Sequence, residues 1–284
     1  MSAARRRALA LAAIALVLGA CSLTRVAYNN ATPALAWYLD DYVDLHEVQR
    51  DWLRERVGRL VAWHRASELP EYQRFLQATA MRTAGRIDEE SARWVYRGLR
   101  LYYHRLLERV LPESADFLLQ LDAGQLAHLE RRFAENQAKA VKESVSGTPA
   151  ERREKRARRF IDQIEGWTGS LTAPQRELVA ARVRAMADVT DDWLADRRHR
   201  QLETLALARA KPPRAEVIAG LKRLYVEPET WRRPEYRERL REREDQIYAM
   251  VATLDATLAP AQRERIARRL RGYVADVAWL MEAS

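Results

Sequence analysis

The sequence predicts an all-α protein, a multi-helix bundle of roughly ten helices that follows a cleaved signal peptide. Apolar residues recur at steps of three and four along several segments, for example from Ile266 to Leu280. No segment shows sustained alternation of apolar and polar residues, and no hairpin signal is present. The ten Gly and ten Pro lie mainly between the periodic segments, where they would end helices, and a hydrophobic fraction of 48% suffices for a buried core.

Residues 1–20 read as a secretory signal peptide. Arg5, Arg6 and Arg7 form a positive patch, and residues 8–19 are uncharged and mostly Ala, Leu, Ile and Val. A basic start, a short apolar stretch and small residues before a cleavage site are typical of an exported chain. The apolar run is well short of the about 20 residues that a transmembrane helix needs. We therefore expect residues 1–20 to be removed.

The end of this segment, Leu18-Gly19-Ala20-Cys21, resembles the lipobox of bacterial lipoproteins. The resemblance implies cleavage before Cys21, a diacylglycerol thioether on its sulfur, and an acyl chain such as palmitate on its new amino group. The membrane is then a partner of the chain through these lipids. In bacterial lipoproteins, an Asp directly after the lipidated Cys often retains the protein in the inner membrane. This chain has Ser22 at that position, so the resemblance implies the periplasmic face of the outer membrane. Residues 21–32 are expected to form the lipidated Cys and a short tether.

Export and the single Cys restrict the remaining partners. One Cys rules out an internal disulfide and a Cys-based zinc site, and no cofactor is expected. Although the formal net charge is +9, an exported chain is not expected to bind nucleic acid. The anionic surfaces of the envelope are phospholipid, lipopolysaccharide and cell-wall polymer.

Residues 33–284 are expected to form a single helical domain, with a possible sub-boundary near 146–149, where Ser, Gly, Thr and Pro follow one another. No run of Gly, Pro or Ser is long enough for a flexible linker. The periodicity predicts helices near 34–41, 45–66, 69–84, 89–110, 113–120, 123–145, 150–166, 173–208, 214–225, 235–256 and 260–282.

A Leu-x-x-x-Gln sequence is the most regular internal feature. It occurs as Leu45…Gln49, Leu121…Gln125, Leu171…Gln175 and Leu258…Gln262. The third copy fits a capping box, in which the Thr172 hydroxyl accepts an amide proton and Gln175 reaches back to the cap residue. This copy also resembles the Leu-Thr-x-x-Gln motif of small helical periplasmic stress chaperones. The other copies lack the Thr, so helix starts are the favoured interpretation.

A family resemblance lies near the start of the expected mature chain. It is carried by Ala27-Tyr28-Asn29-Asn30, by the run from Trp37 to Leu45 with Gln49, by Trp63-His64-Arg65 and by Glu68-Leu69-Pro70-Glu71-Tyr72. These residues resemble an uncharacterised family of Gram-negative helical lipoproteins, known only as a domain of unknown function. The resemblance implies an all-helical lipoprotein over essentially the whole chain and implies no catalytic residue.

One helix face offers a weak metal candidate. Asp188 is followed along the same face by Asp192, Asp196, His199 and Glu203. Imidazole and carboxylates on one face could ligate a transition metal, which makes the last four residues candidates. The favoured alternative is a solvated face with Arg nearby, because no other His is tied to this stripe by its spacing. No metal site is therefore predicted.

The densest basic run is a candidate for contact with an anionic surface. It consists of Arg152, Arg153, Lys155, Arg156, Arg158 and Arg159. Such a helix could lie on anionic lipid with its basic side chains toward the headgroups. The alternative, a solvated face of a core helix with local Glu pairs, is favoured.

Catalytic signals are absent from the sequence. It contains no HExxH, no Gly-x-Ser-x-Gly and no Gly-rich phosphate loop, and His64, in line with Leu53, Val57 and Leu60, fits a hydrogen-bonded core histidine. The expected function is a non-enzymatic outer-membrane lipoprotein whose body binds an envelope protein or acts like a chaperone. The alternative is a metal-binding protein or hydrolase that acts on an envelope substrate.

Overall fold

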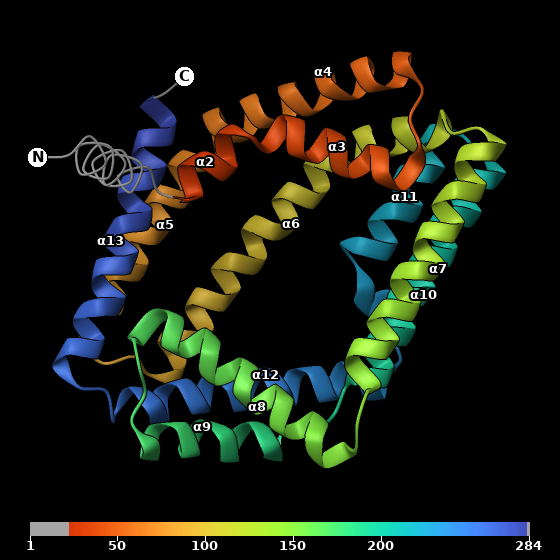
Figure 1. Cartoon of the computed structure of the whole chain (residues 1–284). Coiled ribbons are helices and arrows are strands. Elements are labelled where there is room, and N and C mark those ends of the chain that lie inside the picture. The colour runs from red at the N-terminus through yellow and green to blue at the C-terminus, as the bar shows by residue number, and fades with distance from the viewer. Residues whose placement is uncertain (1–22, 283–284) are drawn as a thin grey trace, which may run out of the picture. The chain divides into compact units, whose positions relative to one another are not determined.

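The computed structural model describes residues 23–282, and Figure 1 follows their helices along the chain. No strand occurs within these residues, so the prediction of an all-α, multi-helix fold is confirmed. The helices are α2 (Leu23–Asn29), α3 (Ala31–Val43), α4 (Glu47–Trp63), the π-helical turn η1 (His64–Glu68), α5 (Leu69–Arg82), α6 (Glu89–Leu119), α7 (Ala123–Val145), α8 (Pro149–Thr168), α9 (Ala173–Ala185), α10 (Thr190–Ala210), α11 (Arg214–Tyr225), the 3-10 turn η2 (Pro228–Thr230), α12 (Pro234–Asp255) and α13 (Pro260–Glu282). The predicted signal peptide and the lipobox with Cys21 lie outside the described residues.

Contacts divide the described residues into two compact units. Unit 1 comprises residues 23–41, 45–76 and 272–282, and unit 2 comprises residues 42–44 and 77–271. The suggested sub-boundary near 146–149 lies inside unit 2, at the connection between α7 and α8. The single domain over 33–284 stays a prediction.

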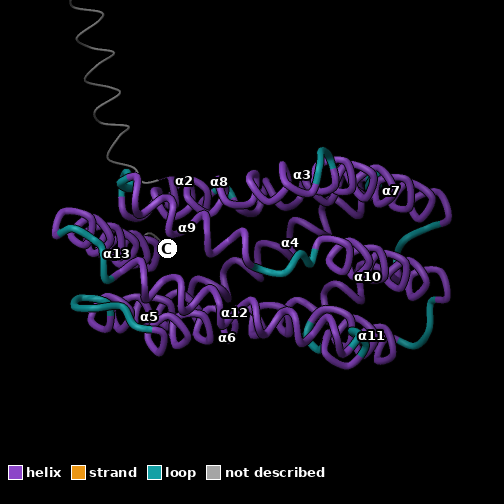
Figure 2. Tube along the Cα trace, turned by 90° about the horizontal axis from the view of Figure 1, so that it is seen from below, coloured by secondary structure: helices purple, strands orange, loops and turns teal. Residues whose placement is uncertain are grey.

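Unit 2 is a series of pairwise helix packings. Helix α8 packs on α9, α9 on α12, α12 on α6, α6 on α11, α11 on α10, and α10 on α7. Figure 2 shows α7, α10 and α11 one above another. The long α6 lies in the middle of this series and contacts both of its neighbours: Tyr96 donates a hydrogen bond to Glu244 of α12 at 2.8 Å, and Asp116 pairs with Arg214 of α11 at 2.5 Å.

One cluster of buried apolar side chains in unit 2 lies where α8, α9 and α12 meet. Val179 and Val183 of α9 are fully enclosed, and Ala157 of α8 and Met250 of α12 pack with them. Burying a Val, Leu or Met side chain contributes about 1.5–3 kcal/mol. This cluster therefore gives the three helices a common core.

Unit 1 has a smaller core, in which α5 packs on the C-terminal part of α13. Leu69 of α5 packs with Val277 and Leu280 of α13, and Tyr28 of α2 packs against this cluster. Arg25 of α2 binds Asp276 of α13 at 2.7 Å. The segment expected to be a tether is therefore a helix over Leu23–Asn29, because its side chains find partners on α13.

The Leu-x-x-x-Gln sequences all start helices, which confirms the capping interpretation. Each Gln Oε1 accepts the N–H three residues before it, at 3.0 Å for Gln49, 3.2 Å for Gln125, 2.9 Å for Gln175 and 2.9 Å for Gln262. At the third copy the Thr172 hydroxyl accepts the Gln175 N–H, which completes the box.

Two of these starts also bind each other within unit 2. The side-chain amides of Gln175 and Gln262 exchange two hydrogen bonds of 3.1 Å. The Nε2 of Gln175 donates to the carbonyl of Thr257, and that of Gln262 donates to the carbonyl of Ser170. The motif therefore joins the beginnings of α9 and α13 as well as capping them.

The predicted helix over 173–208 is wrong because the chain is interrupted between Ala185 and Thr190. Met186 has an extended backbone, and the Asp188 carboxylate accepts the N–H of Thr190 at 3.0 Å. The carbonyl of Ala187 accepts a hydrogen bond from Arg243 of α12 at 3.1 Å. A local contact from Asp188 and a contact from α12 thus satisfy two of the groups that the interruption leaves without helical partners.

Two predicted interruptions are absent. Helix α6 continues through Pro112, and the buried Leu111, Ala115 and Leu118 hold it against its neighbours. The predicted gap between 66 and 69 is filled by η1, whose π-helical turn joins α4 to α5. Tertiary packing overrides the local preference of Pro112 and Pro70 to end helices.

Candidate functional site

The acidic face of α10 is occupied by arginines. Asp192 is buried and binds Arg233, the residue just before α12, at 2.5 Å and also Arg239 of α12. Asp196 is also buried and binds Arg232 at 2.5 Å, with Arg200 at 3.6 Å. Guanidinium groups thus occupy the carboxylate oxygens that a metal would need.

The other two metal candidates do not join these carboxylates. The ring of His199 packs against that of Trp231 with the centroids 4.5 Å apart and the planes tilted by 45°. Glu203 forms no ion pair in the described part of the chain. Within residues 23–282, no group of three or more His, Cys, Asp or Glu side chains could hold a metal ion. The α10 face is an ion-pair cluster of α10 with the start of α12 and the residues just before it.

The basic run lies on α8 and splits into two sets. Arg152 and Lys155 donate to the last carbonyls of α7 and the loop after it, namely those of Val145, Gly147 and Glu143, and Arg156 binds Asp188 at 2.8 Å. Arg153, Arg158 and Arg159 are exposed. Three of the six candidates therefore bind within unit 2, and three face solvent.

The pKa of Asp188 reflects its contact with Arg156, one of these arginines. Burial alone would raise its pKa, but hydrogen bonds from Thr190 and Arg156 dominate and lower the pKa to about 2. The Asp188 carboxylate is therefore charged at neutral pH and fixes the start of α10 against α8.

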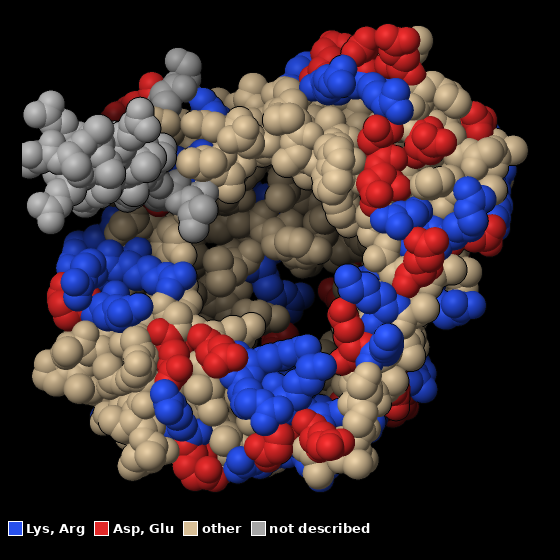
Figure 3. Space-filling model, in the orientation of Figure 1, with Lys and Arg blue, Asp and Glu red and all other residues tan. Residues whose placement is uncertain are grey.

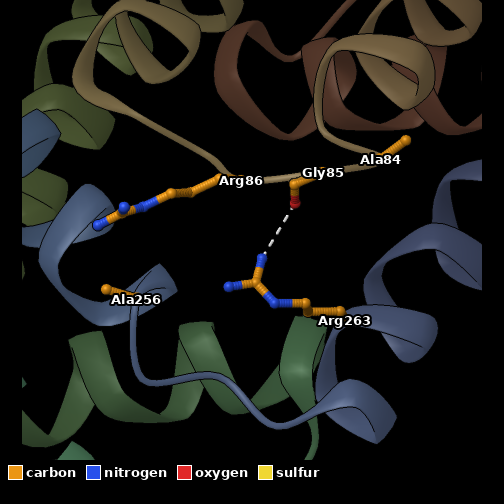
Figure 4. Close-up of a pocket in the computed structure, with 5 residues that line it drawn as sticks. All are labelled: Ala84, Gly85, Arg86, Ala256 and Arg263. Carbon is orange, nitrogen blue, oxygen red and sulfur yellow. Dashed lines mark hydrogen bonds between the residues drawn. The ribbon is translucent and has the colours of Figure 1, made fainter.

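A cavity of about 470 Å³ lies between the α5–α6 loop and the α12–α13 turn (Figure 4). Ala84, Gly85, Arg86, Ala256 and Arg263 line it. Arg263 donates to the Gly85 carbonyl at 3.0 Å, across the cavity.

Most of the polar groups at this cavity have structural partners. Arg263 also binds both carboxylate oxygens of Asp255, and Asp255 accepts the N–H of Ile87 at 3.0 Å. These bonds fasten the two loops to each other. Arg86 also lines the cavity, and its side chain is exposed. One exposed guanidinium does not by itself make a ligand site.

His64 is the centre of a hydrogen-bonded group in unit 1, as the sequence indicated. Its Nδ1 lies 2.9 Å from the Tyr28 hydroxyl and its Nε2 lies 3.2 Å from the Tyr72 hydroxyl. Arg65 binds Asn29 at 3.1 Å beside it, and Glu68 in the same π-helical turn is only 1% exposed. Burial lowers the pKa of His64 and raises the pKa of Tyr28. This group joins α2 to η1 and α5.

Sequence reasoning missed an exposed apolar surface on α2 and α3, which we call the α2–α3 face. It consists of Val26, Pro33, Ala34, Leu35, Trp37 and Tyr38, all exposed. Trp37 is 72% exposed. Figure 3 shows mostly uncharged surface, drawn in tan, over α3. The available signal was a run without any charged residue from Val26 to Leu39, in a chain with 31% charged residues.

No helix within residues 23–282 has the length and apolar character to cross a bilayer.

Comparison with known families gives a match over a large part of the chain. A family of unknown function, DUF6279, matches residues 41–237, which is most of the chain. Neither curated proteins nor solved structures give a match. The chain therefore belongs to the DUF6279 family, as the resemblance to an uncharacterised family suggested.

Proposed function

We propose that this member of the DUF6279 family is a lipoprotein of the bacterial envelope, held at the periplasmic face of the outer membrane by lipids on Cys21. Its helical body binds another envelope protein and performs no catalysis. The observation that carries the proposal is the position of the lipobox. Ser22 alone separates Cys21 from α2, and α2 is built into unit 1 through Arg25 and Tyr28.

The lipids suffice to hold the body at the membrane. Each buried CH₂ of an acyl chain contributes about 0.8 kcal/mol, and two lipid signals already give stable anchoring. Because α2 follows the lipidated residue almost at once, the body has no long tether and stays at the bilayer surface.

The middle of α6 supports the proposed binding of a protein partner. Leu99, Leu101 and Tyr103 are each more than half exposed. Exposed apolar groups of this kind are typical of protein interaction sites. Leu99 and Tyr103 are four residues apart and share one face of α6, whereas Leu101 lies on another face. Helix α6 also packs on α11 and α12, so the face with Leu99 and Tyr103 is presented on a rigid element.

The anchor is tested by replacing Cys21 with Ser in the full chain. We expect the wild-type protein to sediment with membranes and to carry the mass of its lipids, and the Cys21→Ser form to become soluble. A Cys21→Ser form that stays in the membrane fraction, with an unmodified sulfur in the wild type, would refute the anchor.

The partner is tested by crosslinking in cells from a photoreactive residue at position 103. The matched control places the same residue at exposed Gln163 of α8. We expect one protein to be captured from position 103 and not from position 163. A stoichiometric metal in the purified protein, lost in Asp196→Ala and His199→Ala variants, would instead favour the metal-binding alternative.

A further inference from the structure

We propose that the α2–α3 face lies in the boundary between headgroups and acyl chains of the same membrane that holds Cys21. The lipid anchor and this face then form two membrane contacts on one side of unit 1. The proposal rests on the proposed lipid anchor and adds to it a membrane-binding surface made of side chains.

The first argument is the distance along the chain from the anchor to the face. Helix α2 begins at Leu23, and Val26 is five residues after Cys21. Five residues span at most about 18 Å when extended, and less where they are helical. The acyl chains on Cys21 therefore hold the beginning of the face within reach of the bilayer surface.

The second argument is charge. The run from Val26 to Leu39 contains no charged residue and is the longest such run within residues 23–282. The charged residues at its two ends are paired inside unit 1, since Arg25 binds Asp276 at 2.7 Å and Asp40 binds Arg50 at 3.2 Å. The face can therefore enter the interface without taking an unpaired charge out of water.

The third argument is the type of side chain. Trp and Tyr are enriched where membranes meet water, because their rings are apolar and carry one polar group. Trp37 and Tyr38 are exposed one turn beyond Pro33 and Ala34, so these four residues form one stripe on α3. Asp41 follows where the stripe ends.

The membrane is favoured over a protein as the occupant of this face. The anchor places the face at the bilayer before any partner arrives, and a lipid surface accepts a flat, uncharged, aromatic stripe without a complementary shape. A second copy of the chain on the same face is the competing outcome in the test.

The test uses the full lipidated chain in vesicles of phosphatidylethanolamine and phosphatidylglycerol. Lipidation blocks the sulfur of Cys21, so a Trp37→Cys variant has a single free thiol, which is labelled with a polarity-sensitive dye. Trp193→Cys on α10, where the Trp is 40% exposed, is the matched control. Leu35→Cys is a second probe of the face, in case one substitution alters the local structure.

We expect the dye at positions 37 and 35 to be quenched several-fold more by lipids with a spin label near the headgroup than the dye at position 193. Equal quenching at positions 37, 35 and 193 in membrane-bound protein would overturn this inference and leave the lipid anchor intact. A blue shift at position 37 without lipid, which grows with protein concentration, would show self-association and would also overturn it.

The labelling stoichiometry separates this result from a failure of the anchor. One dye per chain shows that Cys21 is blocked, as the inference requires. Two dyes per chain show a free Cys21 thiol, which would refute the proposed function and this inference together.

Discussion

At the scale of single residues, the glutamines that start helices have both a local and a long-range role. The hydrogen bond that the Thr172 N–H donates to the side-chain oxygen of Gln175 is local and was predictable from the capping box. Its second role is not local, because its Nε2 binds Thr257 and Gln262, more than 80 residues further along the chain. Gln125 likewise donates to the carbonyl of Asp44 in unit 2. No pattern in the sequence identifies these second partners.

We predict that Gln175→Ala destabilises the protein by about 1–3 kcal/mol, because it leaves buried backbone and amide groups without partners. The measurement is the free energy of unfolding in urea. The matched control is Gln163→Ala on the exposed side of α8, which should change stability by less than about 0.5 kcal/mol. Equal effects of the two substitutions would contradict the tertiary role of Gln175.

The His64 group predicts a pH dependence of stability. Burial lowers the pKa of His64 below its ordinary value of 6.5, so the folded chain binds fewer protons than the unfolded chain just below that pH. Stability should therefore decrease as the pH falls through 6.5 toward the lower pKa of the folded state. Urea unfolding at about pH 7 and about pH 5 should show this decrease in the wild type and a smaller one in His64→Gln. A decrease of the same size in both proteins would assign it to other groups.

At the scale of elements, arginines decide how helices meet. Helix α8 was a candidate for an anionic surface, yet Arg152 and Lys155 bind the end of α7 and Arg156 binds the start of α10. Helix α10 was a candidate for a metal site, yet Asp192 and Asp196 bind arginines from α12 and the residues before it. Both faces therefore have structural roles within unit 2.

We predict that Arg156→Ala reduces stability at neutral pH by about 1 kcal/mol, a value reduced for the partial exposure of Asp188. The stability that comes from Asp188 is present at neutral pH, where its carboxylate is charged. It should be lost as the pH falls from about 4 toward about 2, and Arg156→Ala should weaken this acid dependence. The matched control, exposed Arg158→Ala, should change stability by less than about 0.5 kcal/mol. Chemical unfolding at several pH values measures both effects.

At the scale of the whole molecule, burial is distributed unevenly between the two units. Helix α9 in unit 2 buries Gln175, Val179, Ala180 and Val183. Helix α3 buries only Val43, which belongs to unit 2, so the part of α3 in unit 1 buries no side chain. Local opening costs less free energy where fewer side chains are buried. Helices α9 and α3 are therefore expected to differ in the free energy that protects their backbone amides.

We predict that amide hydrogen exchange in the full Cys21→Ser chain, without membranes, is slowest in α9 and α12 and fastest in α2 and α3. Mass spectrometry of peptides from each helix measures the exchange. Protection in α2 and α3 equal to that in α9 would show that unit 1 is as stable as unit 2. In the lipidated wild type on vesicles, α2 and α3 should become more protected if the α2–α3 face contacts lipid.

The sequence by itself determined what local chemistry encodes: the all-α class, most helix positions, and the four glutamine caps, each set within one or two turns. It also predicts the lipidated Cys21, which lies outside the described residues. Only the tertiary structure decided that the chain is interrupted after Ala185, that α6 continues through Pro112, and that arginines occupy the α10 carboxylates. These features depend on partners such as Arg243 for Ala187 and Arg239 for Asp192, which are tens of residues away in the chain. Helical periodicity reports which face of a helix is apolar, and contains no information about which distant side chain will satisfy a buried polar group.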